Sequence, residues 1–156
     1  MKRGIVLIFL CLFLLLNLQP AQGAPKDAVV IAQGIDATTL DPHMRWDTAA
    51  INILMNIYDF LLTRGPDLKI QPLLASSYRI VDDTTWELNL RQGVKFHNGE
   101  EFNAAAVKFS LERLADPKNK LQQTALQIIE RVDIINEYRV QVITKKPFPY
   151  LDAQLT

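Results

Sequence analysis

The residues best suited to catalysis or metal binding are two histidines, His43 and His97, and each falls in a predicted loop. A metal site in a protein needs three or four converging ligands, and neither histidine has such partners at a suitable spacing. Ser110 lies in a predicted helix without a neighbouring base, and the motifs of serine hydrolases, phosphate loops and zinc proteases are absent. We therefore expect neither an enzyme nor a cofactor or metal. One alternative is left open, a small secreted metal-binding protein or hydrolase using His43, Asp41 and His97, which would need their loops to converge.

A stretch of irregular sequence, residues 34–46, is the better candidate for a binding site. It follows a short apolar run, and ligand-binding loops in α/β sheets lie at the carboxyl ends of buried strands. Arg45 could bind a carboxylate through two parallel N–H groups, and the ring of Trp46 could form an apolar wall. A purely structural alternative has Trp46 packed on the following helix and Arg45 in solvent. The candidate ligand-binding residues are Ile35, Asp36, His43, Met44, Arg45 and Trp46.

The first 23 residues have the pattern of a cleavable export signal. A basic start is followed by an almost unbroken apolar run, residues 5–18, and then by Ala21 and Gly23 at the spacing of a cleavage site. Cleavage after Gly23 would leave a mature chain of 156 − 23 = 133 residues. Cys11 is the only cysteine and lies inside the leader, so the mature chain would form no disulfide. Export without disulfides fits a bacterial periplasm.

Charge and hydropathy exclude two classes of protein. The chain has 17 basic and 17 acidic residues, and removal of Lys2 and Arg3 with the leader leaves 15 against 17, a net charge of −2. Nucleic-acid-binding proteins normally carry a basic excess, so we expect no nucleic-acid partner. After the leader, no apolar run is long enough to span a bilayer.

Hydrophobic periodicity predicts an α+β fold. Residues 47–63 carry apolar side chains at helical spacing and are expected to form one long helix. Residues 68–96 change to a period of two, which predicts an antiparallel meander, and Asn98-Gly99 predicts a tight turn after it. The remaining expected elements are a helix capped by Asn103 and ended at Asp116-Pro117, a short helix over residues 121–130, a hairpin of residues 132–135 and 138–144, and the start of a helix at residues 151–155.

The apolar run at residues 28–32 predicts a strand that is buried on both faces. Such a strand needs sheet neighbours on both sides, but the other predicted strands pair among themselves. We therefore expect it to belong to a second lobe whose other strands lie beyond Thr156. In this chain its side chains would stay exposed, forfeiting roughly 1.5–3 kcal/mol each, and limited proteolysis should cut first within residues 34–46.

Several segments resemble the family 5 extracellular solute-binding proteins, which serve ABC importers of dipeptides, oligopeptides, nickel and glutathione. The most specific match covers residues 93–113, including Gly93-Val94-Lys95-Phe96-His97-Asn98-Gly99 and Phe109-Ser110-Leu111-Glu112-Arg113. Ala105-Ala106 stands where the family often has an acidic pair, a variant that looks like glutathione-type and some peptide-type members. Further matching segments are Thr39-Leu40-Asp41-Pro42-His43, residues 56–61, residues 72–77 and residues 86–91.

The resemblance implies the N-terminal part of a two-lobed periplasmic binding protein of the class II flytrap type. Residues 24–46 would supply the first strand and loop of lobe I, and residues 47–156 the extra small α/β domain, truncated at its C-terminal end. The implied function is capture of a peptide or small peptide-like solute, without catalysis, for the permease subunits of an ABC importer. The protein is expected to be a monomer, and this chain alone to bind solute weakly or not at all. Which solute is carried stays open.

Overall fold

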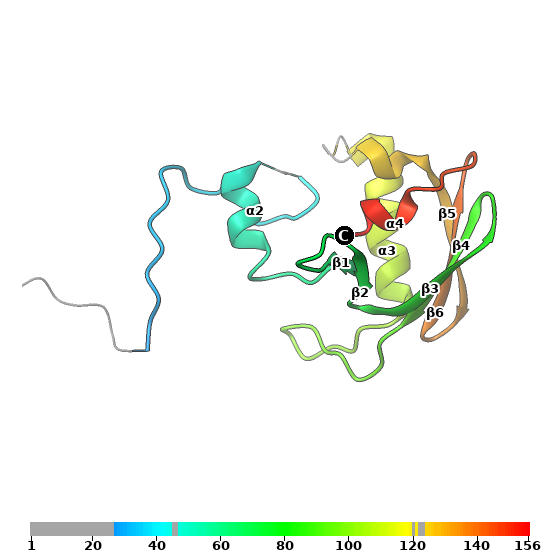
Figure 1. The fold of residues 1–156 in the computed structure, drawn as a ribbon, viewed down its shortest axis with the longest axis horizontal. Helices are drawn as coiled ribbons and strands as arrows, with labels where there is room; N and C mark the ends of the chain where they lie inside the picture. Colours follow the sequence, from blue (N-terminus) through cyan, green and yellow to red (C-terminus); the bar gives the residue numbers. More distant parts are fainter. Residues whose placement is uncertain (1–26, 45–46, 120, 122–123) are drawn as a thin grey trace, which may run out of the picture. The chain divides into compact units, whose positions relative to one another are not determined.

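The structure is a computed structural model that describes residues 27–44, 47–119, 121 and 124–156 (Figure 1). The predicted leader, residues 1–23, lies outside the described residues. The chain divides into two compact units, Met1–Gly34 and Ile35–Thr156. The predicted division at residue 46, which concerns the lobes of longer proteins, stays a prediction. In the described part of the chain, no helix combines the length and the apolar character needed to cross a bilayer.

The described part of the first unit, residues 27–34, contains no helix or strand. Val29, Val30 and Ile31 are 88%, 75% and 81% exposed. As expected for this chain, none of the strands formed by the described residues pairs with residues 28–32, and the strand in a longer protein stays a prediction. The expectation that its apolar side chains would stay exposed is confirmed.

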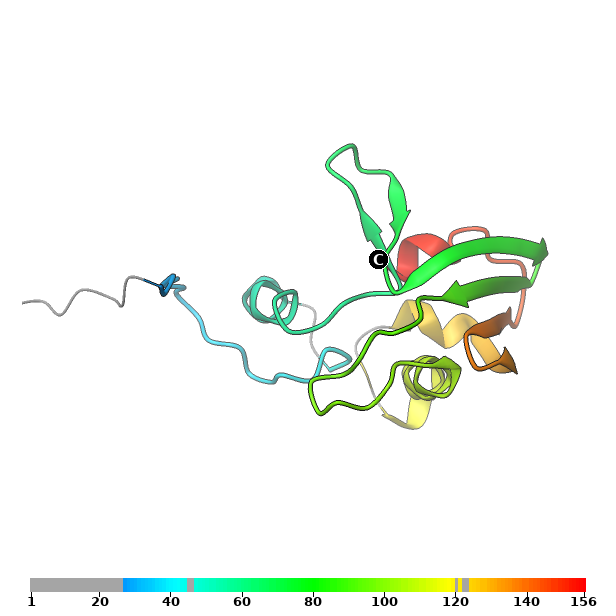
Figure 2. The same ribbon diagram turned by 90° about the horizontal axis from the view of Figure 1, so that it is seen from below.

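A four-stranded antiparallel sheet forms the centre of the second unit (Figures 1 and 2). Of the predicted meander over residues 68–96, the hairpin of residues 75–90 lies in this sheet, and pairing of Trp86 with Val142 and its neighbours joins it to the second predicted hairpin. This mixture of helix and sheet is the predicted α+β class. The strand order is β3-β4-β6-β5, with β3 at Ala75–Asp82, β4 at Thr85–Leu90, β5 at Ile129–Asn136 and β6 at Arg139–Thr144.

Helix α3 (Ala104–Ala115) lies against one face of this sheet in both ribbon views (Figures 1 and 2). Its start is the predicted one, because the side-chain oxygen of Asn103 accepts hydrogen bonds from the N–H groups of Ala105 and Ala106, at 3.0 and 3.2 Å. The helix ends before Pro117, which favours extended backbone at the residue preceding it. The predicted apolar face is buried and consists of Ala104, Val107, Leu111 and Leu114.

The predicted long helix over residues 47–63 is wrong beyond its first half. Helix α2 covers only Thr48–Leu54, with Asp47 accepting a hydrogen bond from the N–H of Ala50 at 3.0 Å. The chain then enters a short hairpin of β1 (Leu62–Arg64) and β2 (Ile70–Pro72). Tertiary contacts override the helical spacing here, because Leu62 packs into the core of the sheet domain, where it is fully buried.

Two loop predictions have different outcomes. Gly99 has the positive φ of 89° expected of the Asn98-Gly99 turn, and its N–H donates to the carbonyl of Phe96 at 2.9 Å. The strand expected to resume at residues 94–96 is reduced to one isolated bridge between Lys95 and Glu101. The whole segment therefore forms a loop that leads into α3.

The last third of the chain departs from the prediction at one place. The described residues of the predicted helix over 121–130 do not form an α-helix; the 3₁₀ turns η1 (Pro117–Asn119) and η2 (Thr124–Ile128) precede β5. The predicted helix start at residues 151–155 is confirmed as α4 (Leu151–Gln154). The carbonyl of Leu155, just after α4, accepts a hydrogen bond from the N–H of Leu62 at 3.0 Å, so α4 and β1 are joined directly.

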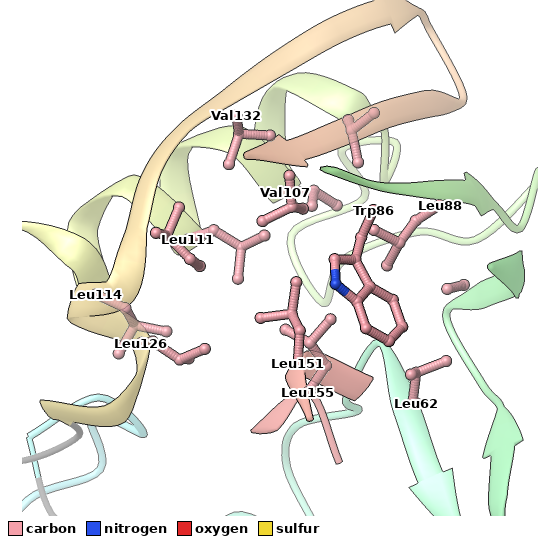
Figure 3. Close-up of a cluster of buried hydrophobic side chains, with 14 of the residues drawn as sticks. Leu62, Trp86, Leu88, Val107, Leu111, Leu114, Leu126, Val132, Leu151 and Leu155 are labelled. Carbon is pink, nitrogen blue, oxygen red and sulfur yellow. The ribbon is translucent and has the colours of Figure 1, made fainter. Parts of the chain in front are cut away.

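The core lies between α3, the sheet, η2 and α4, whose apolar side chains point toward one another in Figure 3. The central side chains have at most a few per cent of their surface exposed. They come from segments far apart in sequence, which ties the fold into one cooperative unit. The labelled members are Leu62, Trp86, Leu88, Val107, Leu111, Leu114, Leu126, Val132, Leu151 and Leu155.

Helix α3 also protects one of the two edges of the sheet, that of β5. Lys108 donates to the carbonyl of Val132 at 2.5 Å, and Glu112 accepts from the N–H of the same residue at 3.2 Å. Strand β5 is the last strand of the sheet, and an uncovered edge strand can pair with another chain. The two side chains thus take the place of a neighbouring strand at Val132.

Substitution of Leu62 tests the division of residues 47–63 into a short helix and a strand. Leu62→Ala should lower the free energy of unfolding by about 2–5 kcal/mol, because it removes a fully buried side chain from a packed core. Met55→Ala is the control, since Met55 is 61% exposed and the change should stay within about 0.5 kcal/mol. Urea denaturation measures both. Equal losses would favour a continuous helix with both residues on its buried stripe.

Candidate functional site

The six candidate ligand-binding residues have different environments. Ile35 is 72% exposed, and Asp36 is exposed and accepts a hydrogen bond from the N–H of Ala37 at 2.8 Å. Met44 is 51% exposed, whereas His43 is half-buried. The remaining two, Arg45 and Trp46, lie outside the described residues. The structure thus incorporates His43 into the domain and leaves Ile35, Asp36 and Met44 open to solvent.

The segment around His43 is a turn, as Asp41-Pro42 predicts. The N–H of His43 donates to Asp41 Oδ1 at 2.9 Å, and the N–H of Met44 donates to the Asp41 carbonyl at 3.2 Å. A further contact holds the start of the turn, because the Tyr58 hydroxyl donates to the carbonyl of Leu40 at 3.1 Å. The local chemistry of an aspartate before a proline therefore shapes the backbone on which His43 is carried.

An arginine from α3, Arg113, connects this turn to the helix. Its Nη1 donates to Asp41 Oδ1 at 3.0 Å, and its Nη2 donates to Asp41 Oδ2 at 2.5 Å. The same Nη1 lies 2.7 Å from His43 Nδ1. A guanidinium can only donate, so we assign Nδ1 as an acceptor and the imidazole proton to Nε2. The three side chains form one charged and hydrogen-bonded cluster.

The ionisation of the cluster follows from these contacts. The hydrogen bond from Arg113 lowers the pKa of Asp41, and the same contact raises the pKa of Arg113. Burial lowers the pKa of His43, and the positive charge of Arg113 acts in the same direction. His43 is therefore neutral at neutral pH, which agrees with its role as an acceptor from Arg113.

A cleft of about 950 Å³ opens beside this cluster, and both His43 and His97 line it. The two histidine loops thus converge on one cleft, as the metal-site or hydrolase alternative requires. The described residues nevertheless contain no group of three or more His, Cys, Asp or Glu side chains able to hold a metal ion. The wall combines apolar and cationic groups, including Phe60, Arg64, Lys95, Phe96, Phe109 and Arg113.

Sequence reasoning placed His43 and Asp41 near each other but missed Arg113. The arginine lies 72 positions from Asp41, and its predicted place near the end of a helix is equally typical of a solvent-exposed residue. The sequence indicated the importance of Arg113 only through its place in residues 93–113, the most specific match to the family. That match does not indicate which residue Arg113 contacts.

Replacement of His43 tests the ionisation of the cluster. The folded-state pKa of His43 lies below its unfolded value of about 6.5. The unfolded chain therefore binds a proton first as the pH falls, and stability is lost between the two pKa values. His43→Asn keeps an acceptor but does not titrate, so its free energy of unfolding should fall less than that of the wild type from pH 7.5 to 5. Urea denaturation at several pH values measures this, and parallel curves would contradict the assignment.

Comparisons with known proteins identify the family. Residues 69–156 match the model of the bacterial extracellular solute-binding proteins, family 5 Middle. The glutathione-binding proteins GsiB of Salmonella typhi and of Escherichia coli K12 are each 39% identical over 127 residues, which are 80% of this chain and 25% of the relative. The chain therefore spans about a quarter of the length of the curated relatives that it matches.

Solved structures agree with this assignment. NikZ of Campylobacter jejuni, solved with Ni(L-His), has a TM-score of 0.76 and 28% identity over 85% of this chain and 27% of its own. AgaA of A. tumefaciens R10, solved with agropinic acid, has a TM-score of 0.71 and 33% identity over 76% of this chain and 24% of its own. The fold is thus that of part of a periplasmic binding protein, and the chain belongs to the family 5 bacterial extracellular solute-binding proteins.

Proposed function

We propose that this chain belongs to the substrate-binding component of an ABC importer that captures peptides or glutathione-like solutes for a membrane permease. The observation that carries the proposal is the 39% identity to glutathione-binding proteins over 127 residues. The solute class of the relatives favours ligands with free carboxylate and amino groups. A binding protein needs no catalytic group, so the function asks only for shape, hydrogen bonds and charge.

Residues 35–46 supply one wall of the solute site in this proposal. Ile35, Asp36 and Met44 are exposed and can meet a ligand without rearrangement of the core. Arg45 would pair with a solute carboxylate and Trp46 would provide an apolar surface, as their chemistry suggests. Closure of a second lobe over the solute would then exclude water and strengthen these polar contacts.

The exposed apolar segment at residues 28–32 supports the same proposal. Val29, Val30 and Ile31 are mostly in solvent, although burial of each would contribute roughly 1.5–3 kcal/mol. We propose that in a protein of the relatives' length this segment becomes a strand of lobe I, paired with strands from sequence that this chain does not contain. Residues 47–156 would then be the extra small domain.

The proposal places the protein in the periplasm as a monomer. The predicted leader at residues 1–23 would direct export, and the transmembrane subunits of the importer would be its partner. Transient docking to a permease requires a surface that is free of self-association, and the covered edge at Val132 is consistent with that requirement.

Calorimetry with reduced glutathione and mixed di- to pentapeptides tests the function in two steps. The 156-residue chain alone should bind weakly or not at all, and micromolar or tighter binding would refute its role as one wall of a larger site. A chimera in which its 127 matched residues replace their counterparts in Escherichia coli GsiB should bind glutathione within about tenfold of the parent's affinity. A folded chimera that binds neither glutathione nor peptide would contradict the proposed solute class.

A further inference from the structure

We infer that Arg113 is a positioning residue for the described end of the proposed solute-binding segment, residues 41–44, and fixes this turn to helix α3. The importance of Arg113 for solute binding rests on the proposed function. That Arg113 fixes the turn follows from the hydrogen bonds alone. In this inference Arg113 does not contact the solute itself. It acts through Asp41 and His43, whose turn also includes the candidate residue Met44.

The contact has the geometry of a strong, direction-specific pair. Nη1 of Arg113 donates to Oδ1 of Asp41 and Nη2 donates to Oδ2, so the planar guanidinium matches the planar carboxylate. The side chains of Arg113 and Asp41 are only 31% and 27% exposed, so solvent screens the pair less than it would a surface pair. The third acceptor, His43 Nδ1, prevents rotation of the guanidinium away from the turn.

Arg113 is itself held by a rigid element. It lies in the last turn of α3, where a cation is favoured by the helix dipole, and its neighbours Leu111 and Leu114 are buried in the core. Its carbonyl also accepts a hydrogen bond from the Asn119 side chain at 2.9 Å. The guanidinium is therefore presented from the most firmly packed helix of the domain.

The contact with Arg113 also fixes the main chain of the turn, because Asp41 is hydrogen-bonded to it. Asp41 Oδ1 accepts from both Arg113 and the N–H of His43, so the carboxylate links the guanidinium to the main chain. The Asp41 carbonyl then accepts from the N–H of Met44. Without Arg113, the segment would keep its local turn and the Tyr58–Leu40 contact but would lose its charged anchor on α3.

A spin label at position 44 measures the hold directly in the full chain. The label is attached through Met44→Cys in a Cys11→Ser background, and position 44 is exposed enough to carry it. The label should show an immobilised spectral component, which Arg113→Met should abolish while the melting curve remains cooperative. Arg113→Lys should restore only part of it, because an ammonium lacks the planar fork. Arg131→Met is the matched control, because the ion pairs of Arg131 within the described residues are with the half-exposed Glu130 and Asp133 on β5.

A double-mutant comparison of Asp41 and Arg113 distinguishes loss of their specific contact from a general increase in mobility of the domain. Asp41→Asn should mobilise the label as Arg113→Met does, and the double variant should be no more mobile than either single variant. An immobilised label in folded Arg113→Met, or additive effects in the double variant, would overturn the inference.

The affinity of the chimera for glutathione tests whether the contact of Arg113 with the turn matters for solute binding. If the anchored segment is the binding-competent one, Arg113→Met should weaken glutathione binding by about tenfold when the competent state falls to roughly a tenth of the population. A mobilised label with unchanged affinity would overturn the positioning role. Failure of the unsubstituted chimera to bind would instead count against the proposed function, and the label experiment would still decide whether Arg113 anchors the segment.

Discussion

Packing of α3 on the β3-β4-β6-β5 sheet is the constraint on which the rest of the structure depends. Four residues of the helix, spaced along one face, are buried in a core shared with side chains from strands on both sides of the helix in sequence. The same helix then serves two further purposes with its other faces. Lys108 and Glu112 cover the edge of β5 at Val132, and Arg113 holds the turn at Asp41. The packing of this one apolar face therefore determines where Lys108 and Glu112, and Arg113, can make their polar contacts.

The elements that sequence reasoning predicted correctly are those fixed by local pattern. The alternation along β4, the Asn103 cap and the Gly99 turn each depend on residues within a few positions of one another. The long helix failed because Leu62 satisfies helical spacing and strand packing equally well, and only the distant core decides between them. Residues 28–32 form no strand here because a strand exists only through its neighbours, and the strands of the described residues offer it none, as the sequence predicted.

The candidate site was predictable to a similar extent. The turn at Asp41-Pro42 and the exposure of Asp36 follow from residue type, whereas the exposure of the apolar Met44 does not. The anchor does not, because Asp41 and Arg113 are separated by 72 positions and only the folded domain brings their charges together. Functional segments of binding proteins are often loops placed by a rigid scaffold. In this chain the scaffold is the sheet and helix α3 of the second unit, and the turn at residues 41–44 is attached to it by the side chains of Asp41, His43 and Arg113.

The central claim is that the second unit folds around its own core while residues 27–34 remain outside any sheet. Amide hydrogen exchange of the 156-residue chain tests it most directly. We expect the amides of Trp86, Val140 and Val142 to exchange slowly, through unfolding of the whole unit. The amides of residues 28–32 should be nearly unprotected. Protection at residues 28–32 as strong as that in β4 and β6 would show a paired strand and would contradict the account.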